Sequence, residues 1–72
     1  MGYVIVDVRG ADRFDELLLT DKANAIDKAA SEWERLSEHD KSKRSEFYLM
    51  KVDDLDAYDF GDVDGDIVKR WK

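Results

Sequence analysis

The sequence predicts a small α+β domain of the ββαβ type, in which one long helix covers one face of a three-stranded antiparallel sheet. Two observations support this class. Residues 20–39 place their apolar side chains on about half of a helical wheel. Residues 3–9 and 47–52 instead alternate and are rich in β-branched and aromatic side chains, as strands are. A one-sided helix needs an apolar surface to cover, and a sheet supplies it.

The length and composition predict one domain over residues 1–72. The chain contains no cysteine, which excludes disulfides and thiolate zinc sites and suits a cytoplasmic protein. The short apolar run at the start is broken by Asp7, so we expect no secretory signal. No stretch approaches the roughly 20 apolar residues of a membrane span.

The formal net charge of −6 disfavours nucleic-acid binding and favours a basic protein partner. Much of this charge lies in residues 53–66, which hold seven aspartates, two glycines and no basic residue. We expect this stretch to form an irregular acidic loop.

The first strand and its return are predicted to form a hairpin. In residues 3–9 the side chains of Val4, Val6 and Val8 share one side, and we expect this side to face the helix. Gly10 and Asp12 favour a tight turn, after which residues 13–19 return as a second strand. A helical turn over the same residues is the competing interpretation.

The helix is expected to begin at Thr20 or Asp21, which are both good N-cap residues. Trp33 lies near the middle of the apolar stripe and is expected in the core. Ser37 and Asp40 have the spacing of a capping box, which allows a further helical turn through about residue 43.

A third strand over 47–52 follows, and the alternation of its side chains leaves open which set faces the helix. A right-handed crossover places this strand beside the first, giving the strand order 2-1-3. Residues 66–72 fit either a short helical turn or an edge strand. Either this segment or a second copy of the chain is expected to cover the other face of the sheet.

Three stretches, TDKANAIDKAASEWERLSEHDKSKR, EFYLMKV and DGDIVKRWK, follow the N-terminal hairpin. This arrangement resembles very small bacterial proteins of unknown function that occur among mobile-element and phage genes. The resemblance implies a compact α+β fold and a bacterial source, and it carries no activity or functional residue.

Catalytic and metal-binding motifs are not apparent. His39 is the single histidine, and it fits a solvated position at the helix end better than that of a general base. The stretch 62–66 looks like part of a calcium loop, but the alignment puts Phe60 at the first ligand position and Trp71 at the twelfth. We therefore predict no enzymatic activity, catalytic residue, metal site or cofactor.

The sequence thus points to a small acidic module that binds another protein and contacts neither nucleic acid nor membrane. It would act as a monomer or as a weak homodimer through an uncovered sheet face. The alternative is an acidic mimic of nucleic acid that inhibits a DNA- or RNA-binding protein, since rows of carboxylates can imitate phosphates. Trp71 could also serve as a core residue, and packing is the favoured role. The candidate partner-binding residues are Asp59, Asp62, Asp64, Asp66 and Trp71.

Overall fold

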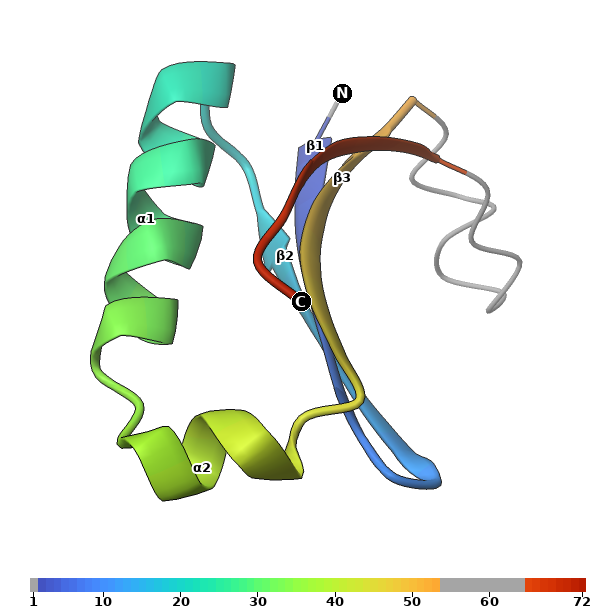
Figure 1. The fold of residues 1–72 in the computed structure, drawn as a ribbon. Helices are drawn as coiled ribbons and strands as arrows, with labels where there is room; N and C mark the ends of the chain where they lie inside the picture. Colours follow the sequence, from blue (N-terminus) through green and yellow to red (C-terminus); the bar gives the residue numbers. More distant parts are fainter. Residues whose placement is uncertain (1, 54–64) are drawn as a thin grey trace.

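The computed structural model describes residues 2–53 and 65–72. A four-stranded antiparallel sheet has the order β2-β1-β3-β4, and the main helix covers one of its faces (Figure 1). The elements are β1 (Gly2–Arg9), β2 (Asp12–Leu18), α1 (Lys22–Glu34), α2 (Glu38–Lys43), β3 (Glu46–Val52) and β4 (Asp66–Arg70). The predicted α+β class and the order 2-1-3 are confirmed. The predicted count of three strands is wrong, because residues 66–70 pair with β3 as a fourth strand.

The hairpin of β1 and β2 turns within two residues, since Arg9 pairs with Asp12 across the sheet. Gly10 adopts a φ of 62°, a conformation that glycine reaches without steric cost. Ala11 keeps a negative φ, so the pair follows the pattern of a type II′ turn. The helical alternative for the second segment is therefore wrong.

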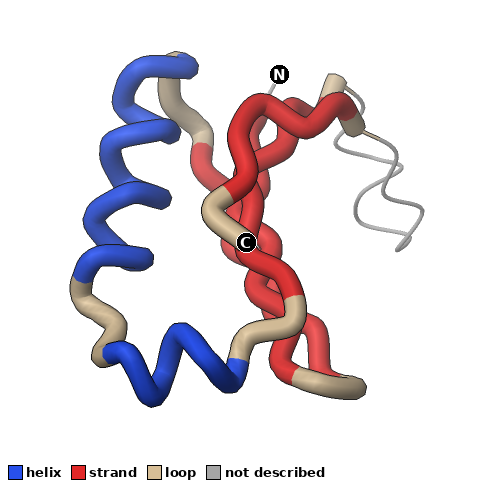
Figure 2. The backbone as a smooth tube through the Cα atoms, in the orientation of Figure 1, coloured by secondary structure: helices blue, strands red, loops and turns tan. Residues whose placement is uncertain are grey.

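The helical segment over 20–39 is divided in two, and the long helix ends at Glu34, just before Ser37, where its regularity was expected to fail (Figure 2). Asp21 caps α1 by accepting a hydrogen bond from the Asn24 backbone N–H at 2.8 Å. Ser37 is extended, and its Oγ accepts from the Asp40 N–H at 3.1 Å to begin α2. The capping-box spacing thus predicted the extra turn. The Ser37 side chain that begins α2 also marks the point where the longer helix stops.

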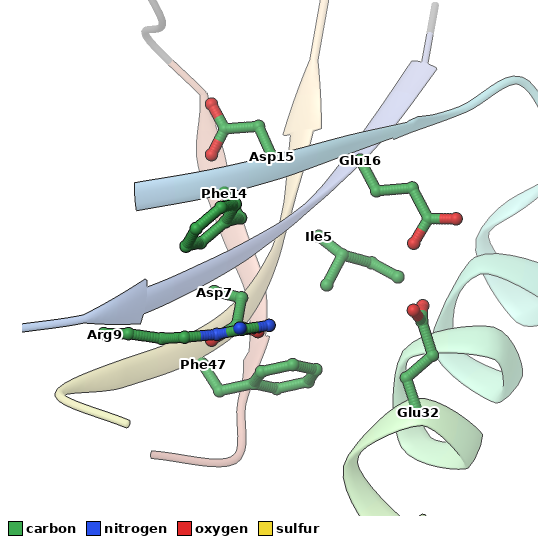
Figure 3. Close-up of a pocket in the computed structure, with 8 residues that line it drawn as sticks. All are labelled: Ile5, Asp7, Arg9, Phe14, Asp15, Glu16, Glu32 and Phe47. Carbon is green, nitrogen blue, oxygen red and sulfur yellow. Dashed lines mark hydrogen bonds and ion pairs between the residues drawn. The ribbon is translucent and has the colours of Figure 1, made fainter. Parts of the chain in front are cut away.

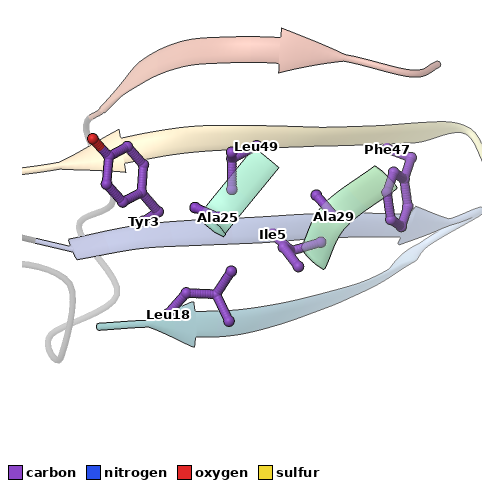
Figure 4. Packing of buried hydrophobic residues seen from close by; sticks show 7 residues of the cluster. All are labelled: Tyr3, Ile5, Leu18, Ala25, Ala29, Phe47 and Leu49. Carbon is purple, nitrogen blue, oxygen red and sulfur yellow. The ribbon is translucent and has the colours of Figure 1, made fainter. Parts of the chain in front are cut away.

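The opposite face of β1 from the one predicted packs against α1. Tyr3 and Ile5 belong to the cluster that contains the helix residues Ala25 and Ala29, whereas the valines lie in a cluster on the other side. The prediction that the valine side faces the helix is wrong. Both sides of β1 carry large apolar side chains, and the uniformly apolar valine side, which alternation favours, is not the side that meets the helix. The small alanines leave room for larger side chains from the sheet, namely Tyr3, Ile5, Leu18, Phe47 and Leu49 (Figure 4).

The valine side of the sheet is also buried. Val4, Val6, Met50 and Val52 form one cluster, and none of these side chains is more than 3% exposed. The expectation of an uncovered face therefore does not hold for these four residues. The oligomeric state itself stays a prediction.

An aromatic row joins α1, β3 and the end of the chain. The ring of Phe47 lies 5.2 Å from that of Trp33 and 5.9 Å from that of Trp71, with an edge-on geometry in the second pair. The Trp71 N–H also donates to the Phe47 carbonyl at 2.9 Å. Of the alternatives left open, the C-terminal segment is thus a strand, and the predicted packing role of Trp71 is confirmed.

Replacing Phe47 with alanine should lower the free energy of unfolding by about 3–5 kcal/mol, because it removes the central ring of this row and leaves a cavity. Phe14, which is 50% exposed, provides the control. Phe14→Ala should cost about 1 kcal/mol or less. Urea denaturation measures both values, and similar losses for the two variants would contradict the packing described.

Candidate functional site

A charged groove lies between α1 and the β1–β2 hairpin (Figure 3). It consists of two hollows of about 160 Å³ and about 250 Å³ that share Asp7, Arg9, Glu32 and Phe47. The smaller hollow is also lined by Ile5, Phe14, Asp15 and Glu16, and the larger one by Arg35, Leu36 and Arg44. Acidic side chains therefore gather near β2, and arginines gather near α2.

The arginine end of the groove is held by a network of ion pairs. Arg44 is only 9% exposed, and its Nε donates to Asp7 Oδ1 at 3.2 Å. Its Nη1 donates to the Asp40 carbonyl at 3.0 Å. Arg9 Nη2 approaches Asp7 Oδ2 to 3.0 Å on the other side. Asp7 thus forms ion pairs with both arginines and links β1 to the end of α2, so its role is structural.

The acidic end differs because two carboxylates face each other. Glu16 on β2 and Glu32 on α1 point toward one another across the groove (Figure 3). Burial raises the pKa of Glu32 above its ordinary value of 4.5, and a hydrogen bond and charge repulsion from Glu16 raise it further. Lys28 and Arg35 lower this pKa, but less strongly. The Oε2 atom of Glu32 is shielded from solvent and has no hydrogen-bond partner in the described part of the chain.

β2 is an edge strand that exposes several large apolar side chains. Among residues 2–53 and 65–72 it pairs with β1 alone, and six of its seven residues are exposed. Phe14 is 50% exposed on the groove side, and Leu17 is 37% exposed on the opposite face. Leu19, just beyond the strand, is 72% exposed. The Arg9 guanidinium lies 4.7 Å from the centre of the Phe14 ring, which positions this ring at the groove.

The candidate residues named from sequence lie elsewhere. Asp59, Asp62 and Asp64 are outside the described residues. Asp66 is exposed at the start of β4, and Trp71 is half-buried against Phe47. Neither Asp66 nor Trp71 lines either hollow of the groove.

Sequence reasoning missed the groove, although one signal was available. Glu32 follows Ala25 and Ala29 by seven and three residues, so helical spacing puts its carboxylate on the buried side of α1. A charged side chain on that side is unusual. His39, in contrast, is exposed on α2 as expected.

Across residues 2–53 and 65–72, no group of three or more histidine or acidic side chains could hold a metal ion. No helix among these residues is long and apolar enough to cross a membrane. No protein-family model, curated protein or solved structure matches the chain. The resemblance to small proteins of mobile elements and phage therefore stays a prediction.

Glu32→Gln should stabilise the protein at neutral pH. The folded state binds the Glu32 proton more tightly than the unfolded chain, so the free energy of unfolding falls as the pH rises from 4.5 through the raised pKa. Glutamine removes this cost. The gain in melting temperature should be largest near pH 7 and should shrink toward pH 4.

Glu34→Gln provides a control with the same change of net charge on an exposed position of α1. It should shift the melting temperature little at either pH. Equal shifts for the two variants, or a loss of stability in Glu32→Gln at pH 7, would contradict the description of the acidic end.

Proposed function

We propose that the protein is a small acidic interaction module that binds an extended segment of another protein along the free edge of β2. The exposed apolar side chains of this edge strand carry the proposal. Phe14 is 50% exposed and Leu17 is 37% exposed on its two faces, whereas two clusters bury most of the large apolar residues of the other strands, with Ile67 on β4 as an exception at 48% exposed. Exposed apolar groups that are concentrated in one place favour a binding surface.

An edge strand offers main-chain hydrogen bonds to a second strand. β1 occupies one side of β2, and the described residues include no strand on its other side. A peptide that adds a strand there gains affinity from main-chain pairing and specificity from the side chains on alternate faces. Phe14 would contact one face of such a peptide, and Leu17 the other.

Charge favours a basic partner over a second copy of the chain. β2 carries three acidic residues and one arginine, and the whole protein has a formal net charge of −6. Charged side chains on an edge strand oppose pairing with an identical edge. They attract a segment of opposite charge. The proposed occupant is therefore an extended segment with both apolar and basic residues.

The shape of the groove is compatible with a polypeptide. Its two hollows measure about 160 Å³ and about 250 Å³ and share part of their lining. Each hollow on its own is smaller than the roughly 300–1,000 Å³ of typical small-molecule sites. Individual side chains of a bound segment fit such spaces.

The alternative function, mimicry of nucleic acid, rests on the acidic stretch 53–66. Of this stretch the structure describes residues 53, 65 and 66, and both aspartates among them are exposed. β2 offers the more specific support, so we favour the interaction module. With the resemblance above, we place such a module in the cytoplasm of a bacterium.

Selection from a random linear peptide library against the whole protein tests this proposal. Peptides that bind should lose at least tenfold in affinity for Phe14→Ser, because this variant removes the exposed ring of the edge. Ile67→Ser is the matched control, since Ile67 is 48% exposed on the opposite edge strand and should matter little. Binding should persist at high salt, where screening weakens purely electrostatic contacts.

Two results would contradict the proposal. One is a set of peptides that binds Phe14→Ser as well as it binds Ile67→Ser. The other is a concentration-dependent dimer in sedimentation velocity that Phe14→Ser abolishes, because a second copy would then occupy the edge. A pull-down from a bacterial lysate distinguishes the alternative. If the protein captured nucleic-acid-binding proteins at low salt and lost them at high salt, this result would support mimicry instead.

A further inference from the structure

We infer that the smaller hollow of the groove is a subsite for one lysine or arginine side chain of the bound segment. Its cationic group would lie between the carboxylates of Glu16 and Glu32, and its aliphatic stem would cover the Phe14 ring. The subsite deepens the proposed function and rests on it, because the segment must first pair with β2.

The position of the subsite follows from the register of the sheet. Glu16 lies opposite Ile5, so its side chain shares the helix-facing side of the sheet. A residue that pairs with Glu16 from an added strand would project its side chain to this same side. That side chain would enter the hollow between β2 and α1 (Figure 3).

The size and lining of the hollow suit a long basic side chain. Its volume of about 160 Å³ accommodates one side chain rather than a whole ligand. Ile5, Phe14 and Phe47 supply apolar surface, against which the methylene groups of lysine or arginine can pack. The carboxylates lie at the end of the hollow that faces α1 (Figure 3).

Among the carboxylates of the hollow, that of Glu32 forms no ion pair with another described residue. Asp7 is paired with two arginines, as described above. Asp15 accepts from Arg13 at 2.9 Å, and Glu16 lies 3.9 Å from Lys28. Among the described residues, Glu32 makes no such ion pair. A guest cation would therefore give Glu32 an ion-pair partner.

One oxygen of Glu32 accepts no hydrogen bond among the described residues. Its Oε2 is shielded from solvent without a partner, and such an unsatisfied polar atom is costly. An ammonium or guanidinium group in the hollow would lie beside this carboxylate and would stabilise its ionised form. Arg9 limits the site at the other end, because its guanidinium already lies on the Phe14 ring and is held by Asp7. The guest cation is thus directed toward α1.

Affinity measurements with Phe14-dependent peptides from the library test the subsite. These peptides should contain a lysine or arginine at one fixed position, and norleucine at that position should weaken binding by about tenfold or more. Glu32→Gln should cause a similar loss. Glu34→Gln removes the same charge from an exposed position and should change affinity less than twofold. Fluorescence anisotropy with labelled peptides reports each value.

A double-mutant cycle completes the test. The losses caused by norleucine and by Glu32→Gln should not add, because both remove the same contact. Additive losses, or equal affinities for the Gln variants of Glu32 and Glu34, would overturn the subsite while leaving the β2 docking surface intact. If no peptide depended on Phe14, the proposed function itself would fail.

Discussion

The close approach of α1 to the sheet at Ala25 and Ala29 determines the arrangement of the rest of the molecule. Both alanines are completely buried, so the helix backbone lies near the side of β1 that carries Tyr3 and Ile5. Larger side chains from the sheet fill the remaining space, as close packing of a protein interior requires. Glu32 follows Ala29 by one helical turn, and this placement brings its carboxylate opposite β2. The groove is therefore a consequence of how the helix packs.

Both faces of β1 are buried, so the apolar side chains that stay exposed elsewhere on the sheet need an explanation. A chain of 72 residues has few apolar side chains to spare, and this one buries two clusters on opposite sides of one sheet. Single exposed apolar residues are common on protein surfaces. Phe14 and Leu17, however, occur on an outer strand of the described sheet, beside a groove in which Glu32 makes no ion pair with another described residue. Their combination, rather than either residue alone, favours a docking surface.

Local patterns in the sequence predicted the elements well, but they could not predict how the elements face each other. Capping chemistry located the starts of both helices at Asp21 and Ser37, and Gly10 located the hairpin turn. The facing of β1 was predicted wrongly because Val4, Val6 and Val8 make the more uniformly apolar side, whereas the helix packs on the side that carries Tyr3, Ile5 and Asp7. The candidate site was missed for a related reason. Glu16 and Glu32 are far apart in sequence, and only the tertiary structure brings them together.

Nuclear Overhauser contacts between methyl groups test the packing of α1 most directly. In the protein labelled at alanine, isoleucine, leucine and valine methyls, Ala25 and Ala29 should show contacts to Ile5 and Leu49. Contacts from these alanines to Val4 and Val6 should be absent, since the valines belong to the cluster on the other side of the sheet. Strong contacts to the valines would show that the helix covers the opposite face and that Glu32 does not meet Glu16.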